Sequence, residues 1–545
     1  MRIPSPLFRS QTSLLALSVL FCTQFLAAQD RMTPELLWKL GRVSDPQVSV
    51  EGARLLYSIR TYDLEQNSGR SQVFLMDTAA GKTQQITEDG SNWSARWSPT
   101  GAQRVAFLST RSGAAQIHVM DLGTRVVRRV TSHPGGVSNM AWSPTGTHFS
   151  FTAEVKMDPD VASMFPDLPK AVARIYDDLM IRHWDRWNEG TYSHLFVVAA
   201  SGKSAPVDLL DGKRVDTPLK PFGGGEQICW SPDGKQLCYT AKVVDAPETS
   251  TDSSLFLVAV DGSDHRNLVP GRPGYDTDPA WSPDGRSIAF HSMHRAGFEA
   301  DRNRIMLMDV ASQEIRELTK GFDQSASGVT WSSDGKSLLF LSDTQGTHQV
   351  YEVDTGGKIR ALTAGRYHFG SAVPGPDGAV YCTRMQMERP NEIVRLDGGE
   401  PGGGVVLTDV NGSIYSNLSL PGTEARWFEA SDGQKIHSWV IYPPDFDDSK
   451  KYPMLLYCQG GPQSQVGQWF SFRWNFHLMA AQGYIVLAVN RRGLPGFGQA
   501  WNDQISRDWG GQAMRDLLTA TDGMFKESYV DRDRTGAVGA SFGGY

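Results

Sequence analysis

Cysteine is scarce in this sequence, with 5 in 545 residues, and Cys22 lies in the apolar stretch at the amino terminus. The remaining four are too few to build a chain of this size from disulfides, so the fold must rest on hydrophobic cores. Cys229 and Cys238 flank one predicted hairpin and could meet, but we favour buried free thiols. Because no His or Cys cluster has the spacing of metal ligands, we expect no metal and no other cofactor.

An excess of basic charge is also absent. The chain has 53 Lys and Arg against 60 Asp and Glu, a net charge of −7. Proteins that bind nucleic acid need a basic stripe to neutralise phosphates, so this balance argues against such a partner.

Long apolar runs are absent too, and the one at the amino terminus is short. Arg2 and Arg9 precede the apolar residues 14–21, and small residues follow near Ala28. This layout is typical of a secretory signal peptide over residues 1–29, and the run is too short for the alternative, a transmembrane anchor. We expect an exported protein, periplasmic or secreted, with no membrane span after cleavage.

Residues 30–420 repeat a turn of Trp, Ser, Pro, Asp or Thr, and Gly, each followed by an apolar strand. Clear copies begin at Trp97, Trp142, Trp230, Trp281 and Trp331, and weaker copies begin at Val48 and Pro374. Intervals of 43 to 51 residues are typical of a β-propeller, in which small sheets pack around an axis. We predict about seven blades and leave an eighth open; a β-sandwich is the less favoured alternative.

One interval is longer, at 88 residues, and indicates an insertion at about 154–190. Within it, residues 171–180 have a helical pattern, and an insertion on a propeller rim usually serves the face that it overhangs. A short helix at 33–41, with Thr33 as its cap, precedes the first repeat.

From about residue 421 to 545, strands alternate with helices, which predicts a parallel sheet. The expected elements are a hairpin at 425–441, strands at 452–458, 484–489 and 535–538, and helices at 469–482 and 512–525. The sheet is unfinished at Tyr545. The predicted architecture is therefore a mixed one, a β-propeller followed by an incomplete α/β-hydrolase domain.

The predicted catalytic serine lies at the end of the last strand, in Gly539-Ala540-Ser541-Phe542-Gly543. Gly-x-Ser-x-Gly after a strand lifts a serine hydroxyl onto a strained turn whose flanking residues must be small. An earlier strand ends in the Gly-rich loop Gln459–Pro462, where the second oxyanion donor is needed. We predict Ser541 as the nucleophile of an acyl transfer, with the backbone N–H groups of Phe542 and of Gly461 or Gly460 as the oxyanion hole.

A histidine must take the serine's proton, and a carboxylate must orient that histidine. In α/β-hydrolases both follow the serine, and here neither does. His477 precedes Ser541 on a predicted helix, where we expect it to pack or face solvent. We therefore expect a C-terminally truncated chain that is inactive as it stands.

Three motifs carry a family resemblance, and together they span the domain after the propeller. They are the run Tyr452–Pro462, the run Asn490–Gly493 with Pro495–Gly498, and Gly539–Tyr545. With the propeller, this layout resembles the prolyl oligopeptidase family of serine peptidases over essentially the whole mature chain. The sequences of residues 457–463 and 182–185 are most similar to those of the bacterial dipeptidyl peptidases of that family.

This resemblance implies peptide substrates with a free amino terminus, from which dipeptides are removed after Ala or an apolar residue. It also implies that the propeller screens out folded proteins and supplies a carboxylate for the substrate's ammonium group. That carboxylate stays unassigned among four candidates near the insertion: Glu154, Asp158, Asp160 and Asp167.

Two residues depart from the family pattern. Gln459 stands where some relatives have a tyrosine that donates to the oxyanion, which favours backbone donation from Gly461. Phe542 replaces a common tyrosine and keeps its N–H. An acylaminoacyl or oligopeptide hydrolase of the same family stays an alternative, as does a catalytically dead propeller that binds a partner. The sequence carries no signal for oligomeric state.

Overall fold

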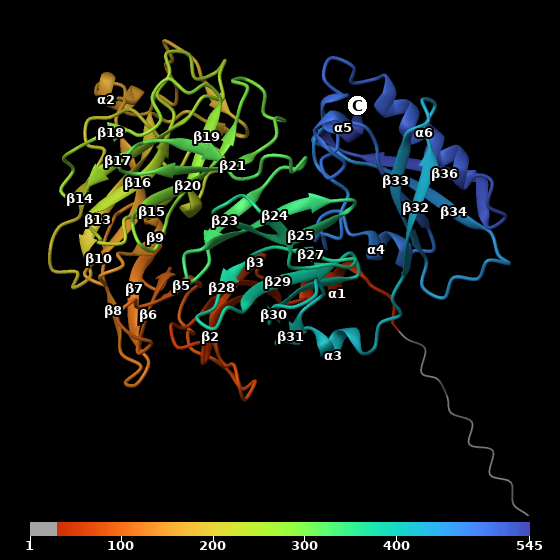
Figure 1. Ribbon diagram of the computed structural model, residues 1–545, viewed down its shortest axis with the longest axis horizontal. Coiled ribbons are helices and arrows are strands. Elements are labelled where there is room, and N and C mark those ends of the chain that lie inside the picture. Colours follow the sequence, from red (N-terminus) through yellow and green to blue (C-terminus); the bar gives the residue numbers. More distant parts are fainter. Residues whose placement is uncertain (1–29) are drawn as a thin grey trace, which may run out of the picture.

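The computed structural model describes residues 30–545, so the expected signal peptide, residues 1–29, lies outside the described residues. Two parts are visible in Figure 1: a ring of small sheets, and a second unit that carries the carboxyl terminus. None of the helices in the described part is long and apolar enough to cross a membrane.

The strands of residues 30–406 form seven blades around a ring. Five blades are separate four-stranded sheets, and the last two are joined in one nine-stranded sheet. Blades 1 to 3 contain β1 (Arg42–Val48), β2 (Arg54–Asp63), β3 (Ser68–Asp77), β4 (Thr83–Gln85), β5 (Asn92–Trp97), β6 (Arg104–Ser109), β7 (Gln116–Asp121), β8 (Val127–Arg129), β9 (Ser138–Trp142), β10 (His148–Lys156), β13 (Thr191–Ala199) and β14 (Val207–Asp208). Blades 4 to 7 contain β15 (Ile228–Trp230), β16 (Gln236–Ala241), β17 (Ser254–Ala259), β18 (Arg266–Asn267), β19 (Tyr275–Trp281), β20 (Ser287–Met293), β21 (Arg304–Asp309), β22 (Ile315–Glu317), β23 (Ser327–Trp331), β24 (Ser337–Thr344), β25 (Thr347–Asp354), β26 (Ile359–Ala361), β28 (Val373–Pro374), β29 (Val380–Gln386), β30 (Arg389–Leu396) and β31 (Val405–Val406).

The bridge between blades 6 and 7 is β27 (His368–Phe369), which pairs with β25 on one side and β29 on the other. The ring closes where blade 7 meets blade 1, through a cluster that includes Val43, Tyr57, Tyr381 and Ile393. Closure between the first and last blades therefore rests on apolar side chains.

The repeated turn connects the first two strands of a blade. In the copy at 230–234, Ser231 Oγ donates to Asp233 Oδ1 at 2.7 Å, and Gly234 has a φ of 69°, which only glycine adopts without strain. The tryptophan that opens a turn also reaches the preceding blade: Trp97 Nε1 donates to Gln47 O at 2.9 Å. The repeats that begin at Trp97, Trp230 and Trp331 thus make both a turn and a hydrogen bond to the preceding blade.

Cys229 and Cys238 lie directly opposite each other on β15 and β16, and both are free thiols. Burial raises the pKa of the Cys238 thiol, which keeps it protonated. Both thiols are therefore free, as expected, but only Cys238 is buried and Cys229 is half-buried.

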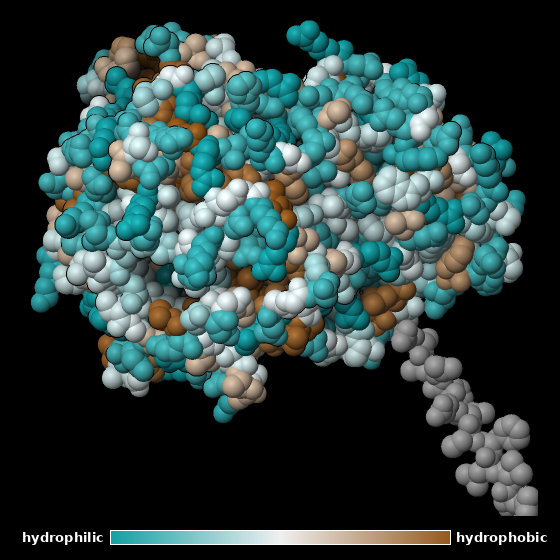
Figure 2. All heavy atoms as spheres, in the orientation of Figure 1, coloured by the Kyte–Doolittle hydropathy of each residue, from teal (hydrophilic) through white to brown (hydrophobic). Residues whose placement is uncertain are grey.

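The insertion between β10 and β13 has little regular structure. It contains α2 (Val161–Met164) and the two-stranded ribbon β11 (Arg182–His183) and β12 (Arg186–Trp187). The predicted helix at 171–180 was wrong: these residues form no helix, and Val172 is 98% exposed. A short helix is marginal without a surface to bury its apolar face, and here no such surface covers it. Figure 2 shows hydrophobic atoms at the surface near the position of α2.

The second unit is a five-stranded sheet between helices. Its strands are β32 (Gly422–Glu429), β33 (Lys435–Tyr442), β34 (Tyr452–Cys458), β35 (Ile485–Asn490) and β36 (Val530–Gly539), in the order β32-β33-β35-β34-β36. Its helices are α4 (Phe476–Ala481), α5 (Gln499–Asp503) and α6 (Gln512–Met524), and α3 (Gly412–Tyr415) precedes it. β34, β35 and β36 are parallel, as strand and helix alternation predicted.

Alternation along β33 sorts its side chains between the two helical layers. Val440 joins the cluster under α6, whereas Trp439 and Ile441 join the cluster under α4. α4 begins at Phe476, seven residues later than its predicted start at 469. Asn475 Oδ1 caps it by accepting from Leu478 N at 2.7 Å. The residues before the cap do not continue the helix, because Phe470 packs into the cluster that contains α1 (Pro34–Lys39).

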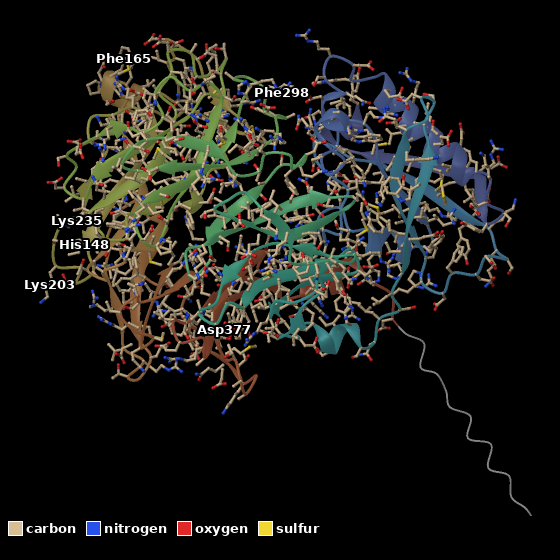
Figure 3. The ribbon with its side chains drawn as sticks, viewed as in Figure 1. His148, Phe165, Lys203, Lys235, Phe298 and Asp377 are labelled. Carbon is tan, nitrogen blue, oxygen red and sulfur yellow. The ribbon has the colours of Figure 1, made fainter. Side chains whose placement is uncertain are left out.

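The second unit docks on one face of the propeller. Its contacts come from connections between second and third strands, as in the hairpins β20–β21 and β24–β25, and from links between blades. Arg295, in the first of these, pairs with Asp503 at 3.3 Å. Figure 3 shows Phe298 of the same connection on the side toward the hydrolase unit. The insertion is also a connection between second and third strands, so it lies on this face, and in Figure 1 its helix α2 lies at the side of the propeller away from the hydrolase unit.

Candidate active site

The candidate site lies at the carboxyl edge of the parallel strands, where α/β folds place their ligands. Cys458, the last residue of β34, is paired with Gly539, the last residue of β36. The loops that follow β34 and β36 therefore leave the sheet at neighbouring positions on the same edge. This register brings the Gly-rich loop next to the turn that carries Ser541.

Ser541 is exposed and has a φ of 56°, in the left-handed region that a residue with a Cβ rarely adopts. It begins the 3-10 turn η2 (Ser541–Gly544) directly after β36. The neighbouring glycines are required by space: a Cβ at Gly539 would lie 2.1 Å from Gly543 O, and one at Gly543 would lie 2.1 Å from Cys458 O. The strained serine on a crowded turn is the geometry of a nucleophile elbow.

The predicted oxyanion loop lies against this turn. A Cβ added to Gly460 would be 2.9 Å from Ala540 O and 3.6 Å from Ser541 Cβ. Gly461 has a φ of 130°, in the region that favours glycine. The structure thus brings Ser541, Phe542, Gly460 and Gly461 together.

Arg491 contacts both the Gly-rich loop and the turn that carries Ser541. Its Nη2 donates to Gln459 O at 3.0 Å and to Pro462 O at 3.2 Å, the two ends of the Gly-rich loop. Its guanidinium also stacks over the Phe542 ring, 4.4 Å from the centroid. Burial lowers the pKa of Arg491 to about 10, so it stays cationic at neutral pH.

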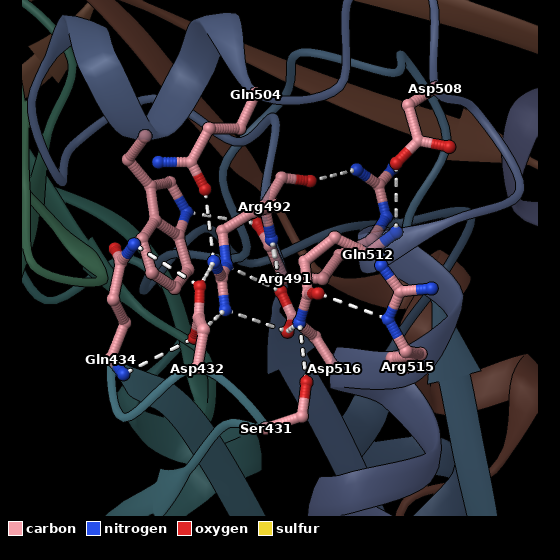
Figure 4. A network of polar contacts seen from close by, with 11 residues as sticks. Ser431, Asp432, Gln434, Arg491, Arg492, Gln504, Asp508, Gln512, Arg515 and Asp516 are labelled. Atoms are coloured by element: carbon pink, nitrogen blue, oxygen red, sulfur yellow. Dashed lines mark hydrogen bonds and ion pairs between the residues drawn. The ribbon is translucent and has the colours of Figure 1, made fainter.

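An ion network lies beside this support (Figure 4), with Arg492 and Asp516 buried and Asp432 at the surface. Arg492 donates from its backbone N and from Nε to Asp516 Oδ2, at 2.8 and 2.9 Å, and from Nη1 to Asp432 Oδ2 at 2.6 Å. Hydrogen bonds from Arg492 lower the pKa of Asp432 to about 2. The network ties the end of β35 to α6 and to the β32–β33 turn, which fixes the loop on which Arg491 lies.

The four candidates for the substrate's ammonium group lie on blade 3 or in its insertion. Glu154 pairs with Lys220 at 2.9 Å, and Asp158 pairs with Arg214 at 2.8 Å. Asp160 Oδ1 accepts from Ser163 N at 2.8 Å and so caps α2. Asp167 is exposed. Three of the four already have a structural partner.

Histidine does not complete the site within residues 30–545. His477 is buried in α4, where Nε2 lies 3.4 Å from Ser419 O, and burial lowers its pKa to about 4. It packs between the units, as expected from its place on a helix. No group of three His, Cys, Asp or Glu side chains within the described residues is arranged to hold a metal ion.

Sequence reasoning missed the supports of the site. It identified Arg491 and Arg492 only as part of a loop motif. Two arginines directly after a fully apolar strand are a usable signal, since a cation at such a position must find buried acceptors. The acceptors themselves, carbonyls 29 and 32 residues away, follow only from the sheet order.

Comparisons with known proteins agree with this architecture. Residues 470–545 match the prolyl oligopeptidase family, and residues 36–171 and 227–413 match the TolB beta propeller domain. The chain is 38% identical over 522 residues to dipeptidyl-peptidase 5 of Porphyromonas gingivalis, which covers 95% of this chain and 76% of that protein. It is 28% identical to dipeptidyl-peptidase 5 of Aspergillus fumigatus, over 94% of this chain and 76% of that protein.

Solved structures show the same fold at lower identity. An acylaminoacyl peptidase in complex with Z-Gly-Gly-Phe-chloromethyl ketone has a TM-score of 0.78 at 18% identity, covering 95% of this chain and 76% of that one. A propeller followed by a hydrolase sheet is thus shared, as predicted. On this identity and coverage, the chain belongs to the prolyl oligopeptidase family of serine peptidases.

Proposed function

We propose that this protein is an exported serine peptidase that works through an acyl-enzyme on Ser541 and removes dipeptides from free amino termini. The observation that carries the proposal is the strained Ser541, with a φ of 56° at the end of β36, beside Gly460. The name shared by the relatives supports the dipeptidyl specificity. Ala or an apolar residue before the cut is the expected preference.

In the proposed reaction, Ser541 Oγ attacks the carbonyl carbon of the scissile bond while a histidine takes its proton. The N–H groups of Phe542 and of Gly461 or Gly460 donate hydrogen bonds to the carbonyl oxygen as negative charge forms on it. The C–N bond breaks as the imidazolium gives its proton to the leaving amine. Water then attacks the ester by the same route and frees the dipeptide and Ser541.

This chemistry needs a histidine and a carboxylate, which follow the serine in the order typical of this fold. Within residues 30–545, none of the hydrogen bonds that histidines make reaches Ser541. We therefore propose that residues 30–545 alone are inactive, and that Ser541 is activated only in a polypeptide that supplies both groups.

The test uses the full-length gene product and a chromogenic Ala-containing dipeptide substrate with a free amine. We expect release of the dye, and at least a thousandfold loss in the Ser541→Ala variant, because the nucleophile is removed. Equal turnover of the amine-blocked substrate would exclude the dipeptidyl specificity and favour an acylaminoacyl or oligopeptide hydrolase.

An active-site fluorophosphonate tests the third alternative, a propeller that binds a partner without catalysis. We expect labelling of the full-length product at Ser541 and no labelling of residues 30–545 alone. Labelling of neither would support the binding protein. Robust labelling of residues 30–545 would instead mean that a group within them activates the serine.

Export is the remaining part of the proposal, and it rests on the sequence of residues 1–29. Mass spectrometry of the mature protein from the cell envelope should give an amino terminus close to Ala28. An intact Met1 in the cytoplasmic fraction would contradict export.

A further inference from the structure

The hairpin of blade 6 reaches from the propeller into the hydrolase unit. Its strands, β24 and β25, are joined by the two-residue turn Gln345-Gly346, with φ values of 44° and 76°. Gln345 N donates to Gly496 O at 2.9 Å, and Gly346 O accepts from Trp439 Nε1 at 3.2 Å. A Cβ at Gly346 would lie 2.5 Å from His437 Cε1, so the tip fits only as glycine.

One side chain of the hydrolase unit is bonded entirely to this hairpin. Gln465 Oε1 accepts from Gly346 N at 2.8 Å, and its Nε2 donates to Asp343 Oδ1 at 2.9 Å and to Thr347 O at 3.0 Å. A side-chain amide has two donor hydrogens and a carbonyl, and all three groups are used here on propeller atoms.

Gln465 follows the predicted oxyanion loop by three residues, and that short segment is held at both ends. At its start, Arg491 donates to Gln459 O. Just past its end, Val466 N donates to Asn490 Oδ1 and Asn490 Nδ2 donates to Val466 O, both at 2.9 Å. Because few free dihedrals lie between Gln465 and Gly461, a displacement of Gln465 also moves Gly461.

We infer that Gln465 is a positioning residue through which the propeller sets the place of the oxyanion loop. The inference rests on the proposed function. When the hairpin is seated, Gln465 holds the loop so that the Gly461 or Gly460 N–H points at the developing negative charge. When the hairpin is displaced, the donor moves away from the reacting oxygen, and catalysis slows before substrate affinity changes.

A contact between the units made by residues outside this loop provides a matched control. Gln499 Nε2 donates to Ala300 O of blade 5 at 3.0 Å and to Asp503 Oδ1 at 2.7 Å. Gln499 is a glutamine of similar burial, at the same interface, on α5. Its loss should weaken the interface without moving the oxyanion loop.

The experiment compares Q465L with Q499L in the full-length gene product. We expect Q465L to lower kcat by about 10- to 100-fold with KM within about twofold, since a small misplacement of a catalytic group has effects of this size. Backbone hydrogen exchange over residues 459–464 should rise in Q465L. Both readouts should stay at the wild-type level in Q499L.

A rescue separates the hydrogen bond from general damage to the interface. Q465E places a carboxylate against the Asp343 carboxyl and should reduce kcat as Q465L does. Adding D343N removes that repulsion and supplies an amide donor to one carboxylate oxygen, while Thr347 O still lacks the donor that Gln465 gave it. The double variant Q465E/D343N should therefore recover part of the lost kcat.

Several outcomes would overturn the inference. They are a kcat within twofold of wild type in Q465L, an unchanged exchange over 459–464, an equal loss in Q499L, or no recovery in the double variant. If the wild type proves to have no peptidase activity, the proposed function fails, and the exchange comparison alone decides whether Gln465 positions the loop.

Discussion

At the scale of single residues, burial keeps several histidines uncharged. His437 on β33 is 2% exposed, accepts a hydrogen bond from Asn490 Nδ2 at 3.0 Å, and lies between the rings of Trp427 and Trp439. Burial lowers the pKa of His437 to about 4, because the apolar rings solvate an imidazolium poorly. The unfolded chain has no such penalty.

Acidification should therefore destabilise the protein through His437. Between about pH 6.5 and pH 4 the unfolded state binds the proton and the folded state does not, so stability rises with pH in this window. Over this window, each unit of acidification should lower the free energy of unfolding of wild type by up to about 1.4 kcal/mol more than that of the H437Q variant. Urea unfolding at pH 7.0, 6.0 and 5.0 measures it.

The exposed His294 provides the control, because H294Q removes a histidine that folding does not bury. Its pH dependence should match that of wild type. Identical slopes for H437Q and wild type would show that His437 is not held neutral by the fold.

At the scale of elements, the propeller blades are linked by the tryptophans that open the repeated turns. The indole N–H of Trp97 donates to Gln47 O at 2.9 Å, and that of Trp331 donates to Ala280 O at 3.0 Å. The indole N–H of Trp281 is buried without an acceptor in residues 30–545. Equivalent repeats thus differ in one hydrogen bond between neighbouring blades.

This difference predicts unequal effects of the same substitution. W97F removes a donor and leaves Gln47 O without its partner, whereas W281F removes a donor that had no acceptor. We expect W97F to cost about 1 kcal/mol more than W281F in the free energy of unfolding. Thermal and urea unfolding of both variants measures the difference, and an equal or larger cost for W281F would refute the link.

At the scale of the whole molecule, the two ends of the propeller meet around one buried amide. Asn411 Oδ1 accepts from Gly41 N at 2.8 Å, and its Nδ2 donates to Gly41 O at 2.9 Å. Asn411 follows blade 7, and Gly41 precedes blade 1 by one residue. This pair of hydrogen bonds supplements the apolar contacts that close the ring.

Removing the amide should loosen this closure. We expect N411A to cost about 2–4 kcal/mol, because two buried backbone groups lose their partners. N411D keeps the acceptor for Gly41 N but places a buried carboxylate against Gly41 O, so it should cost at least as much as N411A. The exposed Asn417 lies in the same segment, and N417A should cost at most about 0.5 kcal/mol. Urea unfolding ranks the three variants, and an N411A as stable as N417A would contradict the proposed closure.

What the sequence determined by itself is local. The blade turns and the elbow around Ser541 depend on which residues tolerate a positive φ or the absence of a Cβ, and these requirements are set by neighbours in the chain. Strand and helix alternation likewise predicted the parallel sheet and placed Gly460 near Ser541, since parallel strands end at one edge.

Only the tertiary structure decided the rest. The predicted helix at 171–180 has the right pattern but no surface to bury it, so it does not form. The late start of α4 depends on Phe470 finding a pocket in the cluster of α1. Gln465 meets Gly346 across 119 residues, and Arg492 meets Asp432 across 60. Such contacts depend on how whole units dock, because each polar group binds whichever partner the fold places beside it.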